Sequence, residues 1–168
     1  MIITDKELLI KECKEVSLFE GQDIIQKLEK ELATSEIPGI GLAANQIGID
    51  AKVCIIRTKE FHLDLINPKI IEKFDLLFFK GEGCLSFPNR HINTKRFNDI
   101  LVVDYLHPSG VVATGLEAIV IQHEVGHLYG ETMFDYQIEL PQGPNSKCWC
   151  GSGKKYKVCH SGKKILSL

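Results

Sequence analysis

The chain lacks the features that would place it in a membrane or direct it through one. None of its apolar runs approaches the roughly 20 residues that a transmembrane helix needs. The first six residues, Met1-Ile2-Ile3-Thr4-Asp5-Lys6, become charged too early for a secretory signal peptide. We therefore expect a cytoplasmic protein without a membrane partner, whose six cysteines are reduced and serve as core residues, metal ligands or nucleophiles.

Acidic residues are absent from the end of the chain. Six lysines and no acidic residue lie from Lys147 onward, so the net charge of −2 for the whole chain leaves −8 on the first 146 residues. This acidic body has no basic stripe of the kind that reads nucleic acid, and we expect no DNA partner. Only the basic tail is suited to a polyanion. Internal repeats are also absent, and 168 residues suit one folded domain with a small appendage.

The spacing of apolar residues predicts an α+β fold. A helix is expected over residues 20–35, where apolar residues recur at helical spacing, and Pro38 follows its end. A second helix is expected to begin at a capping box formed by Thr114 and Glu117 and to end before Gly130. We expect antiparallel strands to surround this second helix. The predicted strands cover residues 52–57, 63–67, 69–74, 76–80, 100–105 and 111–113.

The second predicted helix carries the sequence Gln122-His123-Glu124-Val125-Gly126-His127. Two histidines four residues apart lie on one face of a helix, so the imidazoles of His123 and His127 can reach a single metal ion. Glu124 lies beside them and can take a proton from a metal-bound water. The alternative is a chance match to the H-E-x-x-H pattern on a surface helix.

A third metal ligand is expected, because catalytic zinc-type sites usually keep three protein ligands and leave one position to water. Cys84 is the best candidate, since Gly81 and Gly83 let the backbone near it approach a metal or ligand closely. The alternative is a buried, inert thiol at the end of a strand. The histidines in polar surroundings are expected at the surface instead; these are His62, His91 and His107.

The loop Gly39-Ile40-Gly41-Leu42-Ala43-Ala44-Asn45-Gln46 has three interpretations. It matches G-x-G-x-x-A, but a dinucleotide-binding loop follows a strand and opens a helix, whereas here a predicted helix and Pro38 come first. The second interpretation is a tight connector whose glycines need positive φ. The third is a backbone edge that binds an extended peptide, with the Gln46 amide offered to a substrate oxygen.

Three segments together resemble the signature motifs of the peptide deformylases, in the order of that family. They are the loop Gly39–Gln46, the segment Glu82-Gly83-Cys84-Leu85-Ser86, and Gln122-His123-Glu124-Val125-Gly126-His127-Leu128. The likeness covers about residues 1–140. It implies a deformylase-like fold, in which antiparallel strands surround the metal-binding helix. It also implies a hydrolase that removes the formyl group from the N-terminal formylmethionine of nascent polypeptides, a step of protein biosynthesis.

The resemblance implies a metal centre in which Cys84, His123 and His127 bind the ion and Glu124 is the general base and acid. One cysteine and two histidines suit Zn²⁺, Fe²⁺, Ni²⁺ or Co²⁺. The family likeness implies Fe²⁺ in the cell, with zinc or nickel replacing it readily. By this interpretation one divalent metal ion occupies the catalytic site.

Two further groups of residues are implied around that metal. The side chain of Gln46 and the backbone N–H of Leu85 would hold the oxyanion, and each such donor contributes roughly 10²–10³ in rate in analogous sites. The substrate backbone would lie along Ile40, Gly41 and Gly83. Apolar residues near the metal helix would accept the methionine side chain.

One position departs from the deformylase pattern, which carries an aspartate just before the second histidine where this chain has Gly126. Glycine within a helix costs roughly 1 kcal/mol relative to alanine. We expect Arg96 to be the partner left without a carboxylate, and Gly126→Asp to raise activity or metal retention. The favoured interpretation is an active enzyme with impairment at this position. The alternatives are a catalytically silent homologue that acts as a metal- or peptide-binding adaptor, and a general zinc peptidase.

The end of the chain carries a second metal signal. Two cysteines as C-x-C and a later Cys-His pair, with a Gly-Ser-Gly turn between them, suit a closed tetrahedral zinc site. So short a unit cannot bury a hydrophobic core, and metal binding would supply the free energy that folds it. The alternative is a disulfide pair. The segment resembles the SEC-C motif, which implies one structural Zn²⁺ held by Cys148, Cys150, Cys159 and His160.

These signals divide the chain into a catalytic domain at residues 1–140, a linker at 141–147, and a zinc motif at 148–160 whose basic tail continues to residue 168. Our hypothesis is that the tail docks the enzyme on an acidic partner, ribosomal RNA or protein near the exit tunnel, through a salt-dependent attraction to phosphate. The alternative is a solubilising zinc unit that has no partner.

Overall fold

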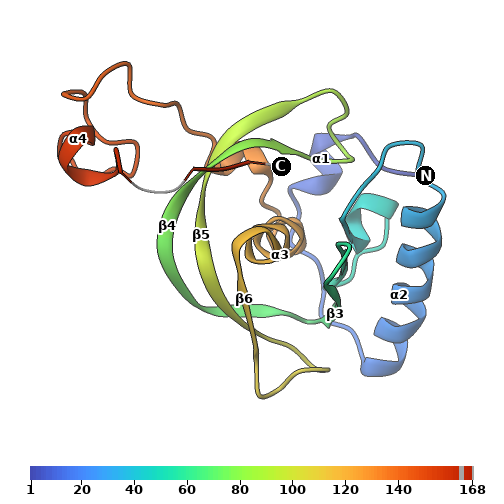
Figure 1. Ribbon diagram of the computed structural model, residues 1–168. Helices are drawn as coiled ribbons and strands as arrows, with labels where there is room; N and C mark the ends of the chain where they lie inside the picture. Colours follow the sequence, from blue (N-terminus) through green and yellow to red (C-terminus); the bar gives the residue numbers. More distant parts are fainter. Residues whose placement is uncertain (163–164, 168) are drawn as a thin grey trace.

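The computed structural model describes residues 1–162 and 165–167, so residues 163, 164 and 168 of the predicted basic tail lie outside it (Figure 1). Within the described part of the chain, no helix is long and apolar enough to cross a bilayer. The elements are, in order, α1 (Lys6–Leu9), α2 (Leu18–Ala33), β1 (Gly41–Ala43), the 3₁₀ helix η1 (Ala44–Ile47), β2 (Val53–Arg57), β3 (His62–Ile66), β4 (Lys69–Gly83), β5 (His91–Val103), β6 (Val111–Thr114), α3 (Gly115–Leu128), the 3₁₀ helix η2 (Met133–Tyr136), α4 (Tyr156–Cys159) and β7 (Ile165–Ser167).

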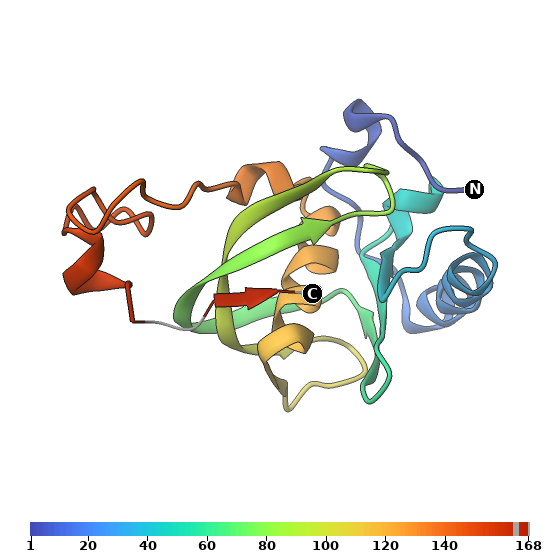
Figure 2. The same cartoon turned by 45° about the horizontal axis from the view of Figure 1, so that its top comes forward.

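The strands form two sheets around one central helix, which confirms the predicted α+β class. Antiparallel pairing joins β1, β2 and β3, while the second sheet has the order β6-β5-β4-β7. In that sheet β7 is parallel to β4, whereas the pairs of β4 with β5 and of β5 with β6 are antiparallel. Helix α3 lies between the curved β4–β5 ribbon on one side and the first sheet on the other (Figures 1 and 2).

Helix α3 is buried on all sides from Ala118 to Leu128, as expected for a helix at the centre of a core. Gly130 adopts φ +76° just past the C-terminal cap, so the predicted end of the helix is confirmed. The predicted capping box is wrong. Thr114 is the N-cap residue, but its side chain makes no cap hydrogen bond; its hydroxyl instead accepts a hydrogen bond from the Asn98 amide at 3.2 Å.

The first long helix begins two residues earlier than predicted. Ser17 caps α2, because its hydroxyl accepts from the backbone N–H of Glu20 at 3.3 Å and the Glu20 carboxylate accepts from the N–H of Ser17 at 3.0 Å. The apolar side of α2 packs on the first sheet, where Ile24, Ile25 and Leu28 are buried. The capping box therefore lies on α2 and not on α3.

The two long strands differ most from the prediction. Residues 69–74 and 76–80 belong to one strand, β4, in which Asp75 has φ +51°. Its partner β5 begins nine residues before the predicted strand at 100–105. The first half of β5 escaped prediction because two residues on its buried face, Thr94 and Arg96, are polar. Their hydrogen bonds, described below, replace the apolar contacts that sequence patterns detect.

The tail is joined to the body and does not stand apart from it. The Trp149 ring meets the Phe78 ring of β4 edge-on, with centroids 5.9 Å apart. After the short helix α4, which projects from the body in Figure 1, strand β7 returns to pair with β4. The two isolated cysteines, Cys13 and Cys54, are buried in the core, and burial holds the pKa of Cys54 well above its ordinary value.

Candidate metal centre and active site

The three predicted ligands meet at one point although Cys84 is far from the two histidines in the sequence. The sulfur of Cys84 lies 3.3 Å from Nε2 of His127, which lies 3.2 Å from Nε2 of His123. Metal bonds of about 2.0–2.1 Å to nitrogen and about 2.3 Å to sulfur put the ligand atoms of a tetrahedral site roughly 3.3–3.6 Å apart. The side chains of α3 and the segment after β4 therefore fit a single divalent ion of the zinc or iron type.

Glu82 orients one of these ligands, a function that the sequence analysis did not assign. Nδ1 of His123 lies 2.6 Å from a carboxylate oxygen of Glu82. A proton on Nδ1 in this bond leaves the lone pair on Nε2 for the metal, and such outer carboxylates fix the tautomer and ring direction of metal ligands. The signal for this role was the position of Glu82, two residues before Cys84 within one motif.

Arg96 is paired, so the expectation that it lacks a carboxylate is wrong. Its guanidinium donates to both oxygens of Glu82, at 2.9 and 2.5 Å, and Thr94 donates to one of them at 2.5 Å. Burial alone would raise the pKa of Glu82, but hydrogen bonds from His123 and the charge of Arg96 hold it well below its ordinary value. Glu82 is therefore a buried anion that three side chains satisfy.

Glu124 is buried at the same point, and among the described residues its Oε2 has no hydrogen-bond partner. Burial raises the pKa of Glu124 to about 7. A free carboxylate oxygen with a pKa near neutrality is what a general base requires. The carboxylate lies beside the backbone of Gly41, where an added Cβ atom would come within 2.6 Å of Oε1.

The loop glycines are needed for space and not for backbone conformation. Gly39 and Gly41 do not have positive φ, which contradicts the connector interpretation. A Cβ atom on Gly39 would come within 2.7 Å of the Leu85 side chain. The dinucleotide interpretation also fails, because the loop follows α2 and leads into strand β1. The peptide-edge interpretation remains.

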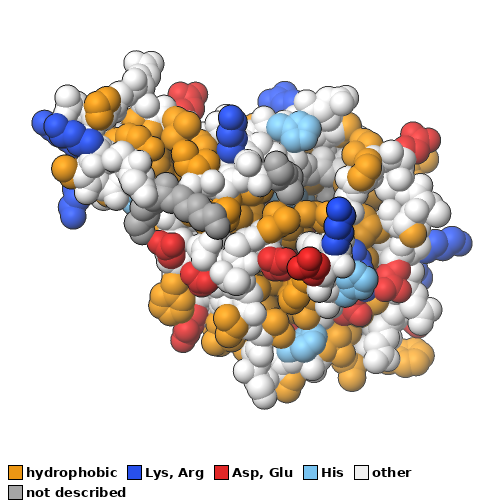
Figure 3. All heavy atoms as spheres, in the orientation of Figure 1, with side chains coloured by type: hydrophobic (Ala, Val, Ile, Leu, Met, Phe, Trp, Pro, Cys, Tyr) orange, Lys and Arg blue, Asp and Glu red, His pale blue; other side chains and the backbone are white. Residues whose placement is uncertain are grey.

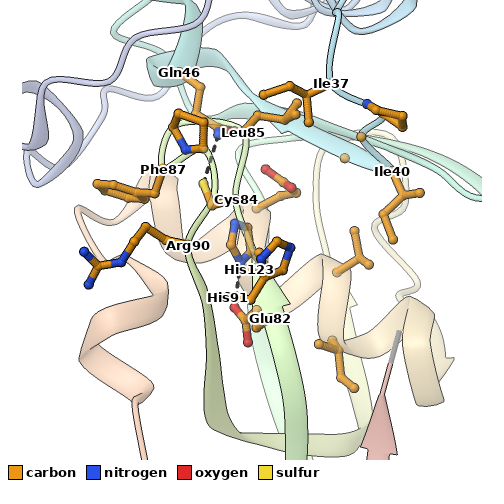
Figure 4. A pocket seen from close by; sticks show the side chains of 18 of the residues that line it. Ile37, Ile40, Gln46, Glu82, Cys84, Leu85, Phe87, Arg90, His91 and His123 are labelled. Atoms are coloured by element: carbon orange, nitrogen blue, oxygen red, sulfur yellow. Dashed lines mark hydrogen bonds and ion pairs between the residues drawn. The ribbon is translucent and has the colours of Figure 1, made fainter.

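Gln46 holds its amide toward the metal ligands. Its carbonyl oxygen accepts from the N–H of Ala43 at 2.9 Å, which turns its NH₂ group toward Cys84 and Ser86. The NH₂ nitrogen lies 3.5 Å from the Cys84 sulfur and 3.1 Å from the Ser86 hydroxyl. Figure 4 shows this contact at the top of the cluster. The adjacent Asn45 donates to the carbonyl of His127 at 2.7 Å and so fixes the loop to α3.

A cavity of about 260 Å³ opens beside the cluster (Figure 4), and we call it the site cavity. All the residues predicted to contact substrate line it: Ile40, Gly41, Gln46, Gly83 and Leu85. His91, expected only at the surface, is exposed but also lines the cavity, as does Arg90. Its apolar wall comes from Phe79 of β4 and from Leu116, Ile119 and Val120 of α3.

The four predicted tail ligands also gather in one place. Nδ1 of His160 lies 3.2 Å from the sulfurs of both Cys148 and Cys159, and the Cys150 and Cys159 sulfurs are 3.6 Å apart. A disulfide bond is about 2.05 Å long, and these cysteines are free thiols. The three sulfurs and one imidazole nitrogen fit a closed tetrahedral zinc site.

Comparison with known proteins gives consistent family matches. The model of the polypeptide deformylase family matches residues 1–142, and that of the SEC-C motif matches residues 145–162. A peptide deformylase of Aquifex aeolicus is 36% identical over 146 residues, which cover 80% of this chain and 85% of the relative. A peptide deformylase of Hydrogenovibrio crunogenus is 33% identical over 144 residues, covering 81% and 83%.

Solved structures of peptide deformylases share the fold. That from Thermotoga maritima superposes with a TM-score of 0.71 at 29% identity, covering 83% of this chain and 97% of the other. That from Synechococcus elongatus, crystallised in complex with actinonin, superposes with a TM-score of 0.73 at 33% identity, covering 83% and 78%. The similarity therefore extends from the three motifs to most of the chain.

Proposed function

The chain belongs to the polypeptide deformylase family, and we propose that its metal centre removes the formyl group from the N-terminal formylmethionine of nascent polypeptides. It is a metal-dependent hydrolase by this membership. The observation that carries the proposal is the meeting of Cys84, His123 and His127 beside the buried carboxylate of Glu124, at the end of a cavity that has an apolar wall. We place this activity in the cytoplasm, where nascent chains appear.

A divalent metal held by Cys84, His123 and His127 supplies Lewis-acid chemistry at the formyl group. The mixed sulfur and nitrogen donors suit Fe²⁺, Zn²⁺, Ni²⁺ and Co²⁺. We propose Fe²⁺ in the cell, with zinc or nickel as replacements. Glu82 keeps His123 in the tautomer that a metal requires.

Glu124 is the group that moves the proton. Its Oε2, which bonds no other described residue, accepts a proton from the attacking water, and the same carboxyl group then gives that proton to the departing amine. Burial raises the pKa of Glu124, which strengthens the carboxylate as a base. General base catalysis of this kind contributes on the order of 10²–10⁴ in rate.

Two donors support the assignment of an oxyanion site. The Gln46 amide is held in one orientation by the N–H of Ala43, so its NH₂ group faces the ligand cluster. Leu85 is the residue directly after the ligand Cys84. Its backbone N–H donates to no acceptor within the described residues. Donors already held in place lose little freedom during the reaction, and each contributes about 3–4 kcal/mol in analogous sites.

The open edge of β1 is suited to an extended peptide. Strand β1 is the outer strand of its sheet, and the carbonyl of Ile40 is already taken by the N–H of Arg57 at 2.8 Å. Since neighbouring residues in a strand direct their backbone groups to opposite edges, we infer that Gly41 presents its N–H and carbonyl to the substrate. Gly83 also lines the site cavity, and the apolar wall receives the methionine side chain.

Release of formate from formyl-Met-Ala-Ser, beside acetyl-Met-Ala-Ser as the matched control, tests the proposal with metal content measured on the same sample. The deformylase releases formate and leaves the acetyl peptide intact. A general zinc peptidase would cleave peptide bonds in both, and a silent adaptor would hold metal without forming product. Glu124→Ala should keep the metal and lose nearly all turnover, whereas Cys84→Ala should lose the metal as well. A Cys84→Ala protein with full metal and full activity would refute the metal assignment.

We also propose that the zinc-bound tail docks the enzyme on ribosomal RNA or protein near the exit tunnel. All four described lysines of the tail are exposed, and they are Lys147, Lys154, Lys155 and Lys157. The tail forms the projection at the left of Figure 3, where lysine side chains lie on its outer end. Phosphate attraction to such a surface weakens steeply with salt.

Ribosome co-sedimentation of the full chain at two salt concentrations tests this docking. A variant with Lys154, Lys155 and Lys157 changed to Glu should lose the association, while a variant with Lys27 and Lys30 of α2 and Lys59 changed to Glu should keep it. Equal sedimentation of both variants with ribosomes would contradict docking through the tail and favour a solubilising zinc unit.

A further inference from the structure

The C-terminal extension, which consists of the zinc motif from Cys148 to His160 and strand β7, contacts strand β4 on both of its faces and along one edge. Strand β7 pairs with β4 so that Ile165, Leu166 and Ser167 lie beside Phe78, Phe79 and Lys80. Figure 2 shows β7 next to β4 and in front of α3. Successive side chains of a strand point to opposite faces. The extension therefore reaches the inner face of β4 as well as its outer face.

On the inner face, Leu166 packs in a small apolar cluster. The cluster is formed by Leu77 and Phe79 of β4 and Ile119 of α3, and Leu116 of α3 also packs against it. Three of these four residues, Phe79, Leu116 and Ile119, also form the apolar wall of the site cavity. Leu166 does not line the cavity itself. It is a second layer behind the wall.

On the outer face, Trp149 covers Phe78, the neighbour of Phe79 in the strand. Phe78 and Phe79 are both almost completely buried, at 1% and 2% exposure. The same strand continues through Glu82 and Gly83 to the ligand Cys84. The extension thus fixes the part of β4 that carries both the cavity wall and the start of the metal-binding motif.

We propose that strand β7 sets the size of the subsite for the first side chain of the substrate, with Leu166 as the positioning residue. It acts by supporting the cluster to which Phe79 and Ile119 belong and against which Leu116 packs. This inference rests on the proposed deformylase function and names an element that determines its side-chain specificity. Protein interiors are close-packed. If the Leu166 side chain is removed, the side chains of the cavity wall can therefore shift into the space that it leaves.

The expected effect is a change of selectivity and not a general loss of rate. Removing the Leu166 side chain lets the wall recede, which widens the subsite and admits larger side chains. In a hydrophobic pocket, one methylene group more or less on the substrate changes the selectivity about 10–200-fold. We expect the preference for formyl-Met-Ala-Ser over formyl-Phe-Ala-Ser, measured as the ratio of kcat/KM values, to fall roughly 10-fold in Leu166→Ala, mainly through KM.

The test compares Leu166→Ala with Ile165→Ala in the full-length, metal-loaded protein. Ile165 is the matched control because it lies on the same strand, has the same size and is 46% exposed. Leu166→Phe is a second variant that should narrow the subsite and change the preference in the opposite direction. Thermal melting and metal content of each variant show whether it is folded and loaded.

Opposite shifts in Leu166→Ala and Leu166→Phe, with wild-type selectivity in Ile165→Ala, support the proposal. Wild-type selectivity in both Leu166 variants overturns it, as do equal losses of kcat/KM for both peptides. If Leu166→Ala does not fold, Leu166→Phe alone decides by the direction of its shift. A folded, metal-loaded wild-type protein that releases no formate overturns the proposed function together with this inference, whereas an active enzyme with unshifted variants overturns this inference alone.

Discussion

Glu82 joins three other side chains of the site. Its two carboxylate oxygens meet His123, Arg96 and Thr94, all of them buried. A buried anion is stable only when its acceptor capacity is satisfied, and a buried cation without its anion is strongly unfavourable. Glu82 therefore has two effects on the site: it orients a metal ligand and neutralises Arg96.

Glu82→Gln tests the first of these effects. The amide cannot accept from His123 and Arg96 as the carboxylate does, so the imidazole loses its fixed tautomer, and we expect metal affinity to fall 10–100-fold. Competition with a chromophoric chelator measures it, at a temperature below the lowered melting point of the variant. Glu72→Gln is the control, because Glu72 lies exposed on the same strand. Unchanged affinity in Glu82→Gln would contradict the role.

Gly126 lines a second cavity together with Arg96, Glu131 and Tyr136. Its nearest neighbour is Glu131, whose Cβ and Oε2 would each lie 3.7 Å from an added Cβ atom. An alanine therefore fits in ordinary contact. An aspartate would bring a second carboxylate beside the first, and like charges at such a distance repel.

We accordingly predict that Gly126→Ala raises the free energy of unfolding by about 0.5–1 kcal/mol, the usual gain of alanine over glycine within a helix. Gly126→Asp should give less or none of this gain in stability. Adding Glu131→Gln should recover stability in the aspartate variant. Urea unfolding of the three variants measures these changes, and greater stability of the aspartate variant over the alanine variant would oppose this account.

At the scale of elements, α2 and α3 begin in different ways. Ser17 and Glu20 form a reciprocal cap at the start of α2. At the start of α3 the Thr114 hydroxyl instead accepts a hydrogen bond from the Asn98 side chain on β5. Helix α2 lies on the outside of the first sheet and needs its cap, because water competes for its first N–H groups. Helix α3 is enclosed by both sheets and is held mainly by packing.

Ser17→Ala should therefore lower the free energy of unfolding by about 0.5–2 kcal/mol, the usual cost of losing an N-cap. Thr114→Ala is the matched control, and it should cost little because the Thr114 hydroxyl caps no backbone group. Denaturant unfolding curves give both values. Equal losses in the two variants would show that the difference between the caps has no energetic effect.

At the scale of the whole molecule, an acidic body and a basic tail meet along β4. The tail is too small for a core of its own, and the metal supplies most of its folding energy. Trp149 is the only tryptophan of the chain, and it lies between Phe78 of the body and His160 of the tail. Its fluorescence therefore reports on the junction alone.

Cys159→Ser should remove one of the four tail ligands and release the metal there. We expect Trp149 emission to shift to the red as the ring leaves Phe78, while the far-UV circular dichroism changes little because the body contains the long helices and strands. Ser161→Ala is the control and should leave the emission unchanged, because the exposed Ser161 hydroxyl donates to the Lys157 carbonyl and not to a ligand. Wild-type emission and zinc content in Cys159→Ser would show that this cysteine is not a ligand.

The sequence alone determined the features that depend on short-range spacing. His123, Glu124 and His127 lie within about one turn of a helix, and the tail ligands Cys148 to His160 lie within one short segment. The order of three motifs then indicated the family, which the comparisons confirm. Helical period and motif order are local properties, so they can be read without knowing how the chain folds back on itself.

Only the tertiary structure decided which distant residues meet. Glu82 and His123 are 41 positions apart, Gly41 is required because the Glu124 carboxylate lies against it, and Leu166 reaches the cavity wall through the register of β7 on β4. Strand register moves every side chain to one face or the other, and the chain carries no local signal for it when the buried residues are polar, as in the first half of β5. Long-range pairing thus set the carboxylate network, the approach of Cys84 to the histidines and the second layer of the cavity wall, while local spacing set the histidine pair and the tail ligands.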